Sequence, residues 1–159
     1  MQQKKGQQGF SLIELLIVVA IIGIIAAIAI PNLIASKRAA NEASAVAGIR
    51  TLTGAEATYA NTAGSGAYGD LTTLAGQGLV DSTFGTGAKS GYNFAVTTSG
   101  DGQPATPYRY ISGASPQNIG AGTATGNRQF TSNETGVIWA ATATATTAPT
   151  ATSGNPIGN

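Results

Sequence analysis

One acidic side chain in this sequence stands in surroundings that disfavour a charge. Residues 10–30 form an apolar run of 21 residues, and Glu14 is the only charged residue in it. A carboxylate at mid-bilayer depth costs about 2.5–3.5 kcal/mol, and charges in such segments normally serve a function. The sequence therefore predicts that the function of the protein depends on Glu14.

The sequence contains few of the residue types that common catalytic sites use. The sequence has no His and no Cys, so it lacks Ser-His and Cys-His pairs, thiolates and the commonest metal ligands. Its other acidic residues lack the Asp-x-Asp spacing of calcium loops. A net charge of +1 gives no strong field to attract nucleic acid. We expect no enzyme activity, no cofactor, no bound metal and no nucleic-acid partner.

The apolar run is long enough to cross a membrane as a helix. Its 21 residues span about 32 Å, and a hydrocarbon core is about 30 Å thick. An ordinary secretory signal is the alternative, because Lys4 and Lys5 form a basic start and residues 27–29 resemble a small-residue cleavage site. The mature protein would then be soluble and begin at Ile30. However, the run exceeds the usual h-region of about 7–15 residues, and such a signal has no use for Glu14.

Residues 9–25 read Gly-Phe-Ser-Leu-Ile-Glu-Leu-Leu-Ile-Val-Val-Ala-Ile-Ile-Gly-Ile-Ile. This stretch resembles the type III signal of type IV prepilins and type II secretion pseudopilins. In that family a membrane aspartyl peptidase cuts after the glycine and methylates the new N-terminal phenylalanine. The resemblance therefore implies a leader of residues 1–9, cleavage after Gly9, N-methylation of Phe10, and an assembly role for Glu14, the fifth mature residue.

The resemblance also implies a function and partners. The first choice is the structural subunit of a type IV pilus filament; the alternative is a pseudopilin of a type II secretion system, and a secreted soluble domain comes third. The implied partners are other copies of the chain in a homo-oligomeric filament, the prepilin peptidase/methyltransferase and an inner-membrane assembly platform. The precursor would span the inner membrane once, before reaching an extracellular pilus or a periplasmic pseudopilus.

Two family features leave the choice between pilus and pseudopilus open. Many major pilins close a C-terminal loop with a disulfide, and many major pseudopilins bind calcium near the C-terminus. This sequence has no Cys, and no acidic residue follows Glu134. The sequence therefore shows neither the disulfide typical of major pilins nor the acidic residues typical of the calcium site of major pseudopilins.

Cleavage would give Glu14 a partner. Phe10 would then carry a cationic amine, and Glu14 lies about 6 Å further along the helix axis. When a subunit joins a filament, its amine can pair with the Glu14 carboxylate of a neighbour displaced along the filament axis, so that neither buried charge is stranded. A helix-dipole effect, worth less than about 1 kcal/mol, is compatible with this pairing but does not explain an acid at this depth.

The apolar helix is expected to continue beyond the membrane. Residues 10–31 form the transmembrane and assembly helix, and residues 32–61 its amphipathic continuation. Pro31 removes a backbone hydrogen bond and should bend the helix. Gly23 forms a small-xxx-small pair with Ala27, which suits close packing. The family resemblance implies that residues 23–31 unwind in filaments.

The amphipathic segment carries a weak apolar stripe. Val46, Ile49 and Leu52 (or Thr53) lie at helical spacing, which predicts a face that packs on a sheet. Gly48 and Gly54 each weaken a helix by about 1 kcal/mol, so they mark either close-packing points or positions where glycine is merely tolerated.

The remainder reads as a small globular domain over residues 62–140. Asp70 is expected to cap a short helix that glycines at 76 and 78 close. Residues 91–98, 108–111, 128–131 and 137–140 read as three or four short antiparallel strands. Residues 141–159 hold no charge and no aromatic residue, and predict a flexible Ala/Thr-rich tail. The fold class is therefore α+β, a long N-terminal helix packed on a small antiparallel sheet.

Overall fold

The computed structural model describes residues 9–120 and 122–157, so most of the expected leader, residues 1–8, lies outside the described part. The chain divides into two compact units, Met1–Ser36 and Lys37–Asn159. One long helix, α1, covers Leu12–Asn61 and belongs to both units. Its C-terminal end agrees with the boundary expected from the sequence.

Within the first unit, α1 buries almost none of its side chains. The apolar residues between Leu12 and Leu33 are exposed, with Leu12 at 81% and Ile24 at 66% of their full surface. Pro31 lies inside α1, and the backbone is helical on both sides of it and through Gly23. The bend near Pro31 stays a prediction.

Within the second unit, α1 contributes one face to a core. Ala45, Ile49, Leu52 and Ala55 are buried, and their spacing of three to four residues places them on one side of the helix. The expected stripe is therefore confirmed for Ile49 and Leu52. Val46 lies partly buried at the edge of the same cluster.

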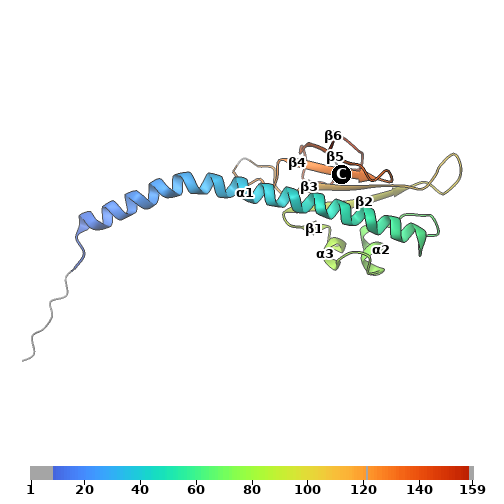
Figure 1. Ribbon diagram of the computed structural model, residues 1–159, viewed down its shortest axis with the longest axis horizontal. Coiled ribbons are helices and arrows are strands. Elements are labelled where there is room, and N and C mark those ends of the chain that lie inside the picture. The colour runs from blue at the N-terminus through green and yellow to red at the C-terminus, as the bar shows by residue number, and fades with distance from the viewer. Residues whose placement is uncertain (1–8, 121, 158–159) are drawn as a thin grey trace, which may run out of the picture. The chain divides into compact units, whose positions relative to one another are not determined.

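The sheet is a six-stranded antiparallel meander in which each strand pairs with the next along the chain. Figure 1 shows these strands in one layer, with the second-unit part of α1 running along it. The strands are β1 (Ala88–Lys89), β2 (Tyr92–Ser99), β3 (Arg109–Pro116), β4 (Arg128–Asn133), β5 (Ile138–Thr142) and β6 (Asn155–Ile157). The α+β architecture predicted from the sequence is confirmed.

The register of the sheet places large and small side chains side by side. Phe94 of β2 pairs with Ala114 of β3, which pairs with Phe130 of β4, which pairs with Ala140 of β5. Residues paired in register point to the same face of a sheet. Phe94, Ala114 and Phe130 belong to the core cluster that also contains Ile49 of α1, and Ala140 packs against it. The helix and the sheet therefore share one hydrophobic core.

Two short helices complete the second unit. Helix α2 covers Leu71–Gly76, and Asp70 caps it by accepting a 2.7 Å hydrogen bond from the backbone N of Thr73. The cap predicted from the sequence is thus confirmed. Helix α3 covers Ser82–Gly85 and was not predicted; Asp81 caps it in the same way.

The number of strands predicted from the sequence is too small. Four of the six were expected, but β1 and β6 were missed and β3 continues to Pro116, well beyond residue 111. These parts are short or built from small residues without the β-branched and aromatic types that favour strands. Pairing with an existing neighbour, rather than local propensity, makes them strands.

The C-terminal segment is part of the sheet domain rather than a free tail. Strand β6 pairs with β5, and the backbone N of Ala143 donates to the carbonyl of Asn127. The side chain of Asn93 donates to the carbonyl of Thr146. Pro149 lies so close to Gly113 of β3 that a side chain at position 113 would collide with Pro149. The expectation of a flexible tail is corrected for these residues, because backbone hydrogen bonds to the sheet replace a core of their own.

Candidate processing and assembly segment

The start of α1 is fixed by two hydrogen bonds between side chains and the backbone. The backbone N of Ser11 donates to Oε2 of Glu14 at 2.8 Å, and the backbone N of Ile13 donates to Oγ of Ser11 at 3.3 Å. The first helical bond, from the N of Leu15 to the carbonyl of Ser11, measures 3.3 Å. This is a variant of the capping box: Glu14, three residues after the N-cap Ser11, satisfies the backbone N–H of Ser11, while Ser11 caps the N–H of Ile13.

The sequence-based reasoning missed the role of Ser11. The expectations for Glu14 are a helix-dipole effect and a pairing with an amine, and neither involves the Ser-x-x-Glu spacing. That spacing before an apolar run is itself a signature of a capping box. Glu14 therefore has a partner within its own chain in addition to any partner outside it.

The peptide bond expected to be cut lies just ahead of this cap. Gly9 and Phe10 are outside α1 and have no regular secondary structure. The side chain of Phe10 is 91% exposed, and a side chain added at Gly9 would meet no other atom within 4 Å. The described residues therefore leave this bond open to approach.

The helix behind the cap is long and apolar enough to cross a membrane, and its most apolar window has no buried residue. A signal sequence near the N-terminus would share these two properties. The other expected site residues in this part are Gly23 and Pro31: a side chain added at Gly23 would meet no atom within 4 Å, and Pro31 is exposed. The structure thus brings together Ser11 and Glu14, while Gly23 and Pro31 lie on exposed parts of α1.

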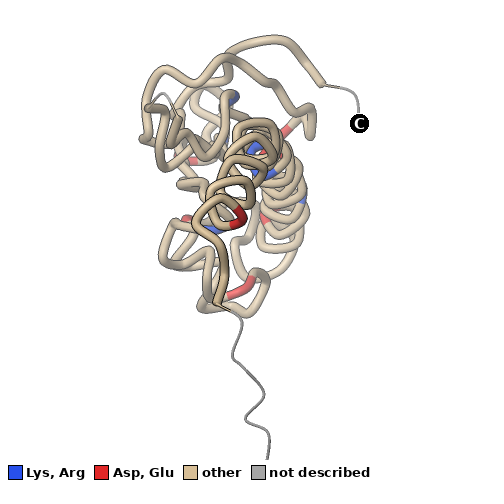
Figure 2. The backbone as a smooth tube through the Cα atoms, turned by 90° about the vertical axis from the view of Figure 1, so that its left-hand side faces the viewer, with Lys and Arg blue, Asp and Glu red and all other residues tan. Residues whose placement is uncertain are grey.

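Charges are sparse elsewhere, and most of the tube in Figure 2 carries none. In the second unit, Glu42 of α1 is nearly buried and accepts two 2.8 Å hydrogen bonds, from the backbone N of Asn127 and from Nε of Arg128. Arg38 and Asn41 donate to carbonyls of the same β3–β4 loop. This cluster, which sequence reasoning missed, holds the loop against the helix.

A second acidic residue of α1 is buried without a cation. Glu56 is fully buried, and its Oε2 accepts a 3.0 Å hydrogen bond from the backbone N of Gly69. Its Oε1 has no hydrogen-bond partner among the described residues. Burial raises the pKa of Glu56 from 4.5 to about 7, against the opposing effect of the Gly69 hydrogen bond, and the nearby charge of Asp70 adds to the rise. Glu56 titrates near neutral pH for structural reasons.

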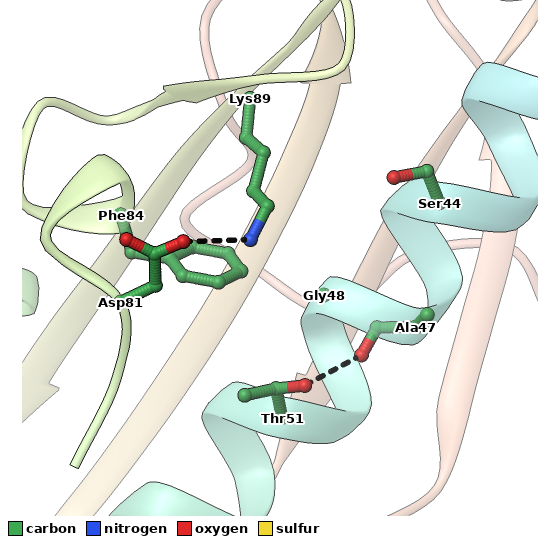
Figure 3. Close-up of a pocket in the computed structure, with 7 residues that line it drawn as sticks. All are labelled: Ser44, Ala47, Gly48, Thr51, Asp81, Phe84 and Lys89. Atoms are coloured by element: carbon green, nitrogen blue, oxygen red, sulfur yellow. Dashed lines mark hydrogen bonds and ion pairs between the residues drawn. The ribbon is translucent and has the colours of Figure 1, made fainter.

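Figure 3 shows a pocket of about 230 Å³ between α1 and the α3–β1 segment. Its two charged residues satisfy each other, since Nζ of Lys89 lies 3.5 Å from Oδ2 of Asp81. The same ammonium group lies 4.4 Å from the centre of the Phe84 ring. The pocket presents no nucleophile paired with a base. Throughout the described residues, no three acidic side chains come together as a metal site.

The N-terminal segment defines the class of protein to which this chain is similar. Residues 4–30 match the family model described as the prokaryotic N-terminal methylation motif. The matched residues contain Gly9, Phe10 and Glu14, so they include the expected cleavage site and the capping box. The resemblance read from residues 9–25 is confirmed.

Two curated proteins are similar to the N-terminal part of this chain. The chain is 58% identical over 38 residues to the type IV wide pilus major component PilA4 of Thermus thermophilus, which covers 24% of this chain and 29% of the relative. It is 42% identical over 50 residues to the type II secretion system core protein G of Aeromonas hydrophila, which covers 31% of this chain and 35% of the relative. The chain thus spans about a third of the length of these relatives, and no solved structure matches it significantly. Its N-terminal segment is pilin-like or pseudopilin-like.

Proposed function

We propose that this chain is the precursor of the structural subunit of a type IV pilus, cleaved after Gly9 and N-methylated at Phe10. The observation that carries the proposal is the combination of a methylation motif with a helix whose apolar side chains remain exposed. A continuous apolar surface of this kind marks a contact with lipid or protein. Lipid covers it before assembly, and neighbouring copies of the same helix cover it in the filament.

Glu14 supplies the directional contact in this assembly. Its Oε2 accepts the hydrogen bond from Ser11, and an ionised carboxylate can accept further hydrogen bonds at both of its oxygens. The amine that cleavage creates on Phe10 of an incoming subunit pairs with Glu14 of a subunit already in the filament. Pairing offsets the cost of burying either charge alone, which amounts to several kcal/mol. Cleavage is therefore a precondition of assembly.

The second candidate is a pseudopilin of a type II secretion system. The match to the type II secretion system core protein G favours it, because this match covers more of the chain than the match to the pilus component. In either case the partners are the prepilin peptidase, an inner-membrane assembly platform and other copies of the chain. The pilus proposal places the product outside the cell, and the pseudopilus proposal places it in the periplasm.

The N-terminus of the natural product tests processing. Mass spectrometry of the purified subunit should show a chain that begins at Phe10 and carries one methyl group on its amine. A product that begins at Ile30 would identify an ordinary secretory signal, and one that keeps Met1 would exclude processing.

The location of the filament separates the two candidates. We expect shearing of intact cells to release filaments that contain the mature subunit. Recovery of the subunit only from the periplasm, together with lost secretion of exoproteins when its gene is deleted, would instead support the pseudopilin.

A further inference from the structure

We propose that Ser11 promotes the cleavage after Gly9 by fixing the first residue of α1. This inference rests on the proposed processing after Gly9. Ser11 acts as a positioning residue for the peptidase, through the shape of the precursor rather than through contact with the reacting atoms. The proposal rests on the capping box at Ser11 and Glu14. This box ends the non-helical stretch at Ser11, and the helix begins at Leu12.

The cap places the Gly9–Phe10 bond at a fixed offset from the helix. Phe10 and Ser11 are the two residues between that bond and Leu12, and both lie outside α1. A residue advances the chain by about 1.5 Å in a helix and by about 3.3 Å in an extended segment. Moving the helix start by one residue therefore shifts the bond by about 2 Å relative to the membrane-spanning helix. A peptidase that holds this helix in the membrane would find the bond displaced.

Small displacements matter at this step. A misplacement of about 1 Å can lower the rate of an enzyme reaction by about a hundredfold. A substrate that adopts the competent conformation only part of the time loses apparent affinity in proportion to that fraction. A precursor without the Ser11 cap populates the competent start of α1 less often, because its first turn frays.

The expected decrease in the cleavage rate follows from the stability that the Ser11 cap gives to the helix start. Replacing a capping Ser by a residue that cannot cap typically destabilises the helix start by an amount that corresponds to about a fivefold change in population. We therefore expect the initial rate of cleavage to fall about fivefold. Glu14→Ala should slow cleavage less, because the hydrogen bond from Ile13 to Ser11 remains. Glu14→Ala therefore serves as a comparison for the Ser11 variants, because both residues belong to the same capping box.

The experiment measures cleavage of the full-length precursor in membranes by prepilin peptidase, with the fraction inserted determined for each variant. Ser11→Thr and Ser11→Asn retain a side-chain acceptor, whereas Ser11→Val has the size of Thr without one. We expect the Thr and Asn variants to be cut within about twofold of the wild-type rate and the Val variant about fivefold more slowly. All products should begin at Phe10.

Two outcomes would overturn the inference while leaving the processing proposal intact. Cleavage of Ser11→Val at the wild-type rate would show that the cap has no role. Cleavage of Ser11→Asn as slow as that of Ser11→Val, with Ser11→Thr normal, would show that the peptidase reads the hydroxyl directly. By contrast, a wild-type precursor that is never cut after Gly9 would refute the proposed function itself.

Discussion

The two units of the chain use the same apolar residue types for opposite purposes. In the second unit Leu52 and Phe130 are fully buried within the chain's own core, whereas in the first unit Leu12 and Ile24 keep most of their surface exposed. A soluble domain does not leave a continuous stretch of this kind uncovered. The apolar surface of the first unit therefore suits contact with lipid or with other protein chains. The second unit, by contrast, buries its apolar residues in a core of its own.

The acidic residues of α1 show the same contrast. Glu14 in the first unit is exposed and, among the described residues, accepts a hydrogen bond from Ser11 at the start of its own helix. Glu42 and Glu56 in the second unit are buried, and both bond to distant parts of the chain. Changes in the first unit should therefore affect processing and assembly, and changes in the second unit should affect folding.

Gly9→Val should have the largest effect, a complete block of cleavage. A side chain at Gly9 meets no atom of the described residues within 4 Å, so the fold should be unchanged. The side chain would instead obstruct the close backbone approach that a glycine allows. We expect the membrane to contain only full-length precursor by mass spectrometry. Mature protein of normal length from this variant would remove the basis for assigning Gly9 to the cleavage site.

Glu14→Ala should lower filament yield with little effect on the subunit. Removing one member of a buried ion pair typically costs about 3–5 kcal/mol, because the other charge is left unpartnered. Insertion should be unharmed, since the segment becomes more apolar. We expect cleaved subunit to accumulate in the membrane and few filaments to be recovered by shearing. Glu14→Gln should assemble poorly as well, because it cannot neutralise the amine.

A matched control for Glu14→Ala lies in the second unit. Glu134→Ala removes an acidic residue that pairs with the exposed Arg109 at 3.0 Å. Exposed pairs contribute about 0–1 kcal/mol, so this variant should form filaments at the wild-type level. A wild-type filament yield from Glu14→Ala would show that the carboxylate is not an assembly determinant.

Local signals in the sequence were enough to predict α1, α2 and the central strands. Asp70 with the residues after it marks α2, and alternation around Phe94 marks β2. The Ser-x-x-Glu spacing at Ser11 was equally available but was not used. In each case the signal lies within a few residues of the element that it specifies, so a single sequence is sufficient to find it.

Features that depend on distant partners could not be predicted. Strand β6 forms because β5 offers an edge, and Pro156 within it argues against a strand by propensity alone. The burial of Glu42 depends on Arg128, and that of Glu56 depends on the loop that contains Gly69. Nothing near either glutamate in the sequence indicates these contacts. The missing information is the three-dimensional packing itself.

Glu56 predicts a stability that falls as the pH rises. Its pKa is about 7 in the folded chain, above its ordinary value of 4.5, so the folded state binds the proton more tightly. The resulting stabilisation is fully present below pH 4.5 and is lost as the pH rises through 7. Between pH 5 and pH 8 the loss amounts to about 2–3 kcal/mol. Unfolding of the mature chain in detergent by urea should show a lower midpoint at pH 8 than at pH 5.

Glu56→Gln is the control for this pH dependence. The amide cannot ionise but can still accept the hydrogen bond from Gly69. The sequence has no His, so few other groups titrate between pH 5 and 8. We expect the variant to unfold at nearly the same urea concentration at both pH values. If it keeps the wild-type pH dependence, another group must be responsible.

The smallest effects are expected from two glycines of α1 that the sequence alone could not tell apart. A side chain at Gly48 would lie 2.8 Å from the ring of Phe94, which packs edge-on against Phe84 in the core. A side chain at Gly54 would meet no atom within 4 Å. Gly48→Ala should therefore destabilise the second unit by about 1–2 kcal/mol, since overpacking outweighs the gain in helix propensity. Gly54→Ala should stabilise it by up to about 1 kcal/mol.

Thermal unfolding of the two variants in parallel gives the sign of each effect, and equal shifts would show that Gly48 is not a close-packing point. The filament yield of Gly54→Ala then tests the separation between the units. Gly54 lies on the exposed side of the second unit, so a change there should leave assembly through the first unit intact. A more stable subunit that forms few filaments would mean that this side of α1 also contacts neighbouring copies. Assembly would then depend on the folded unit as well as on the apolar helix.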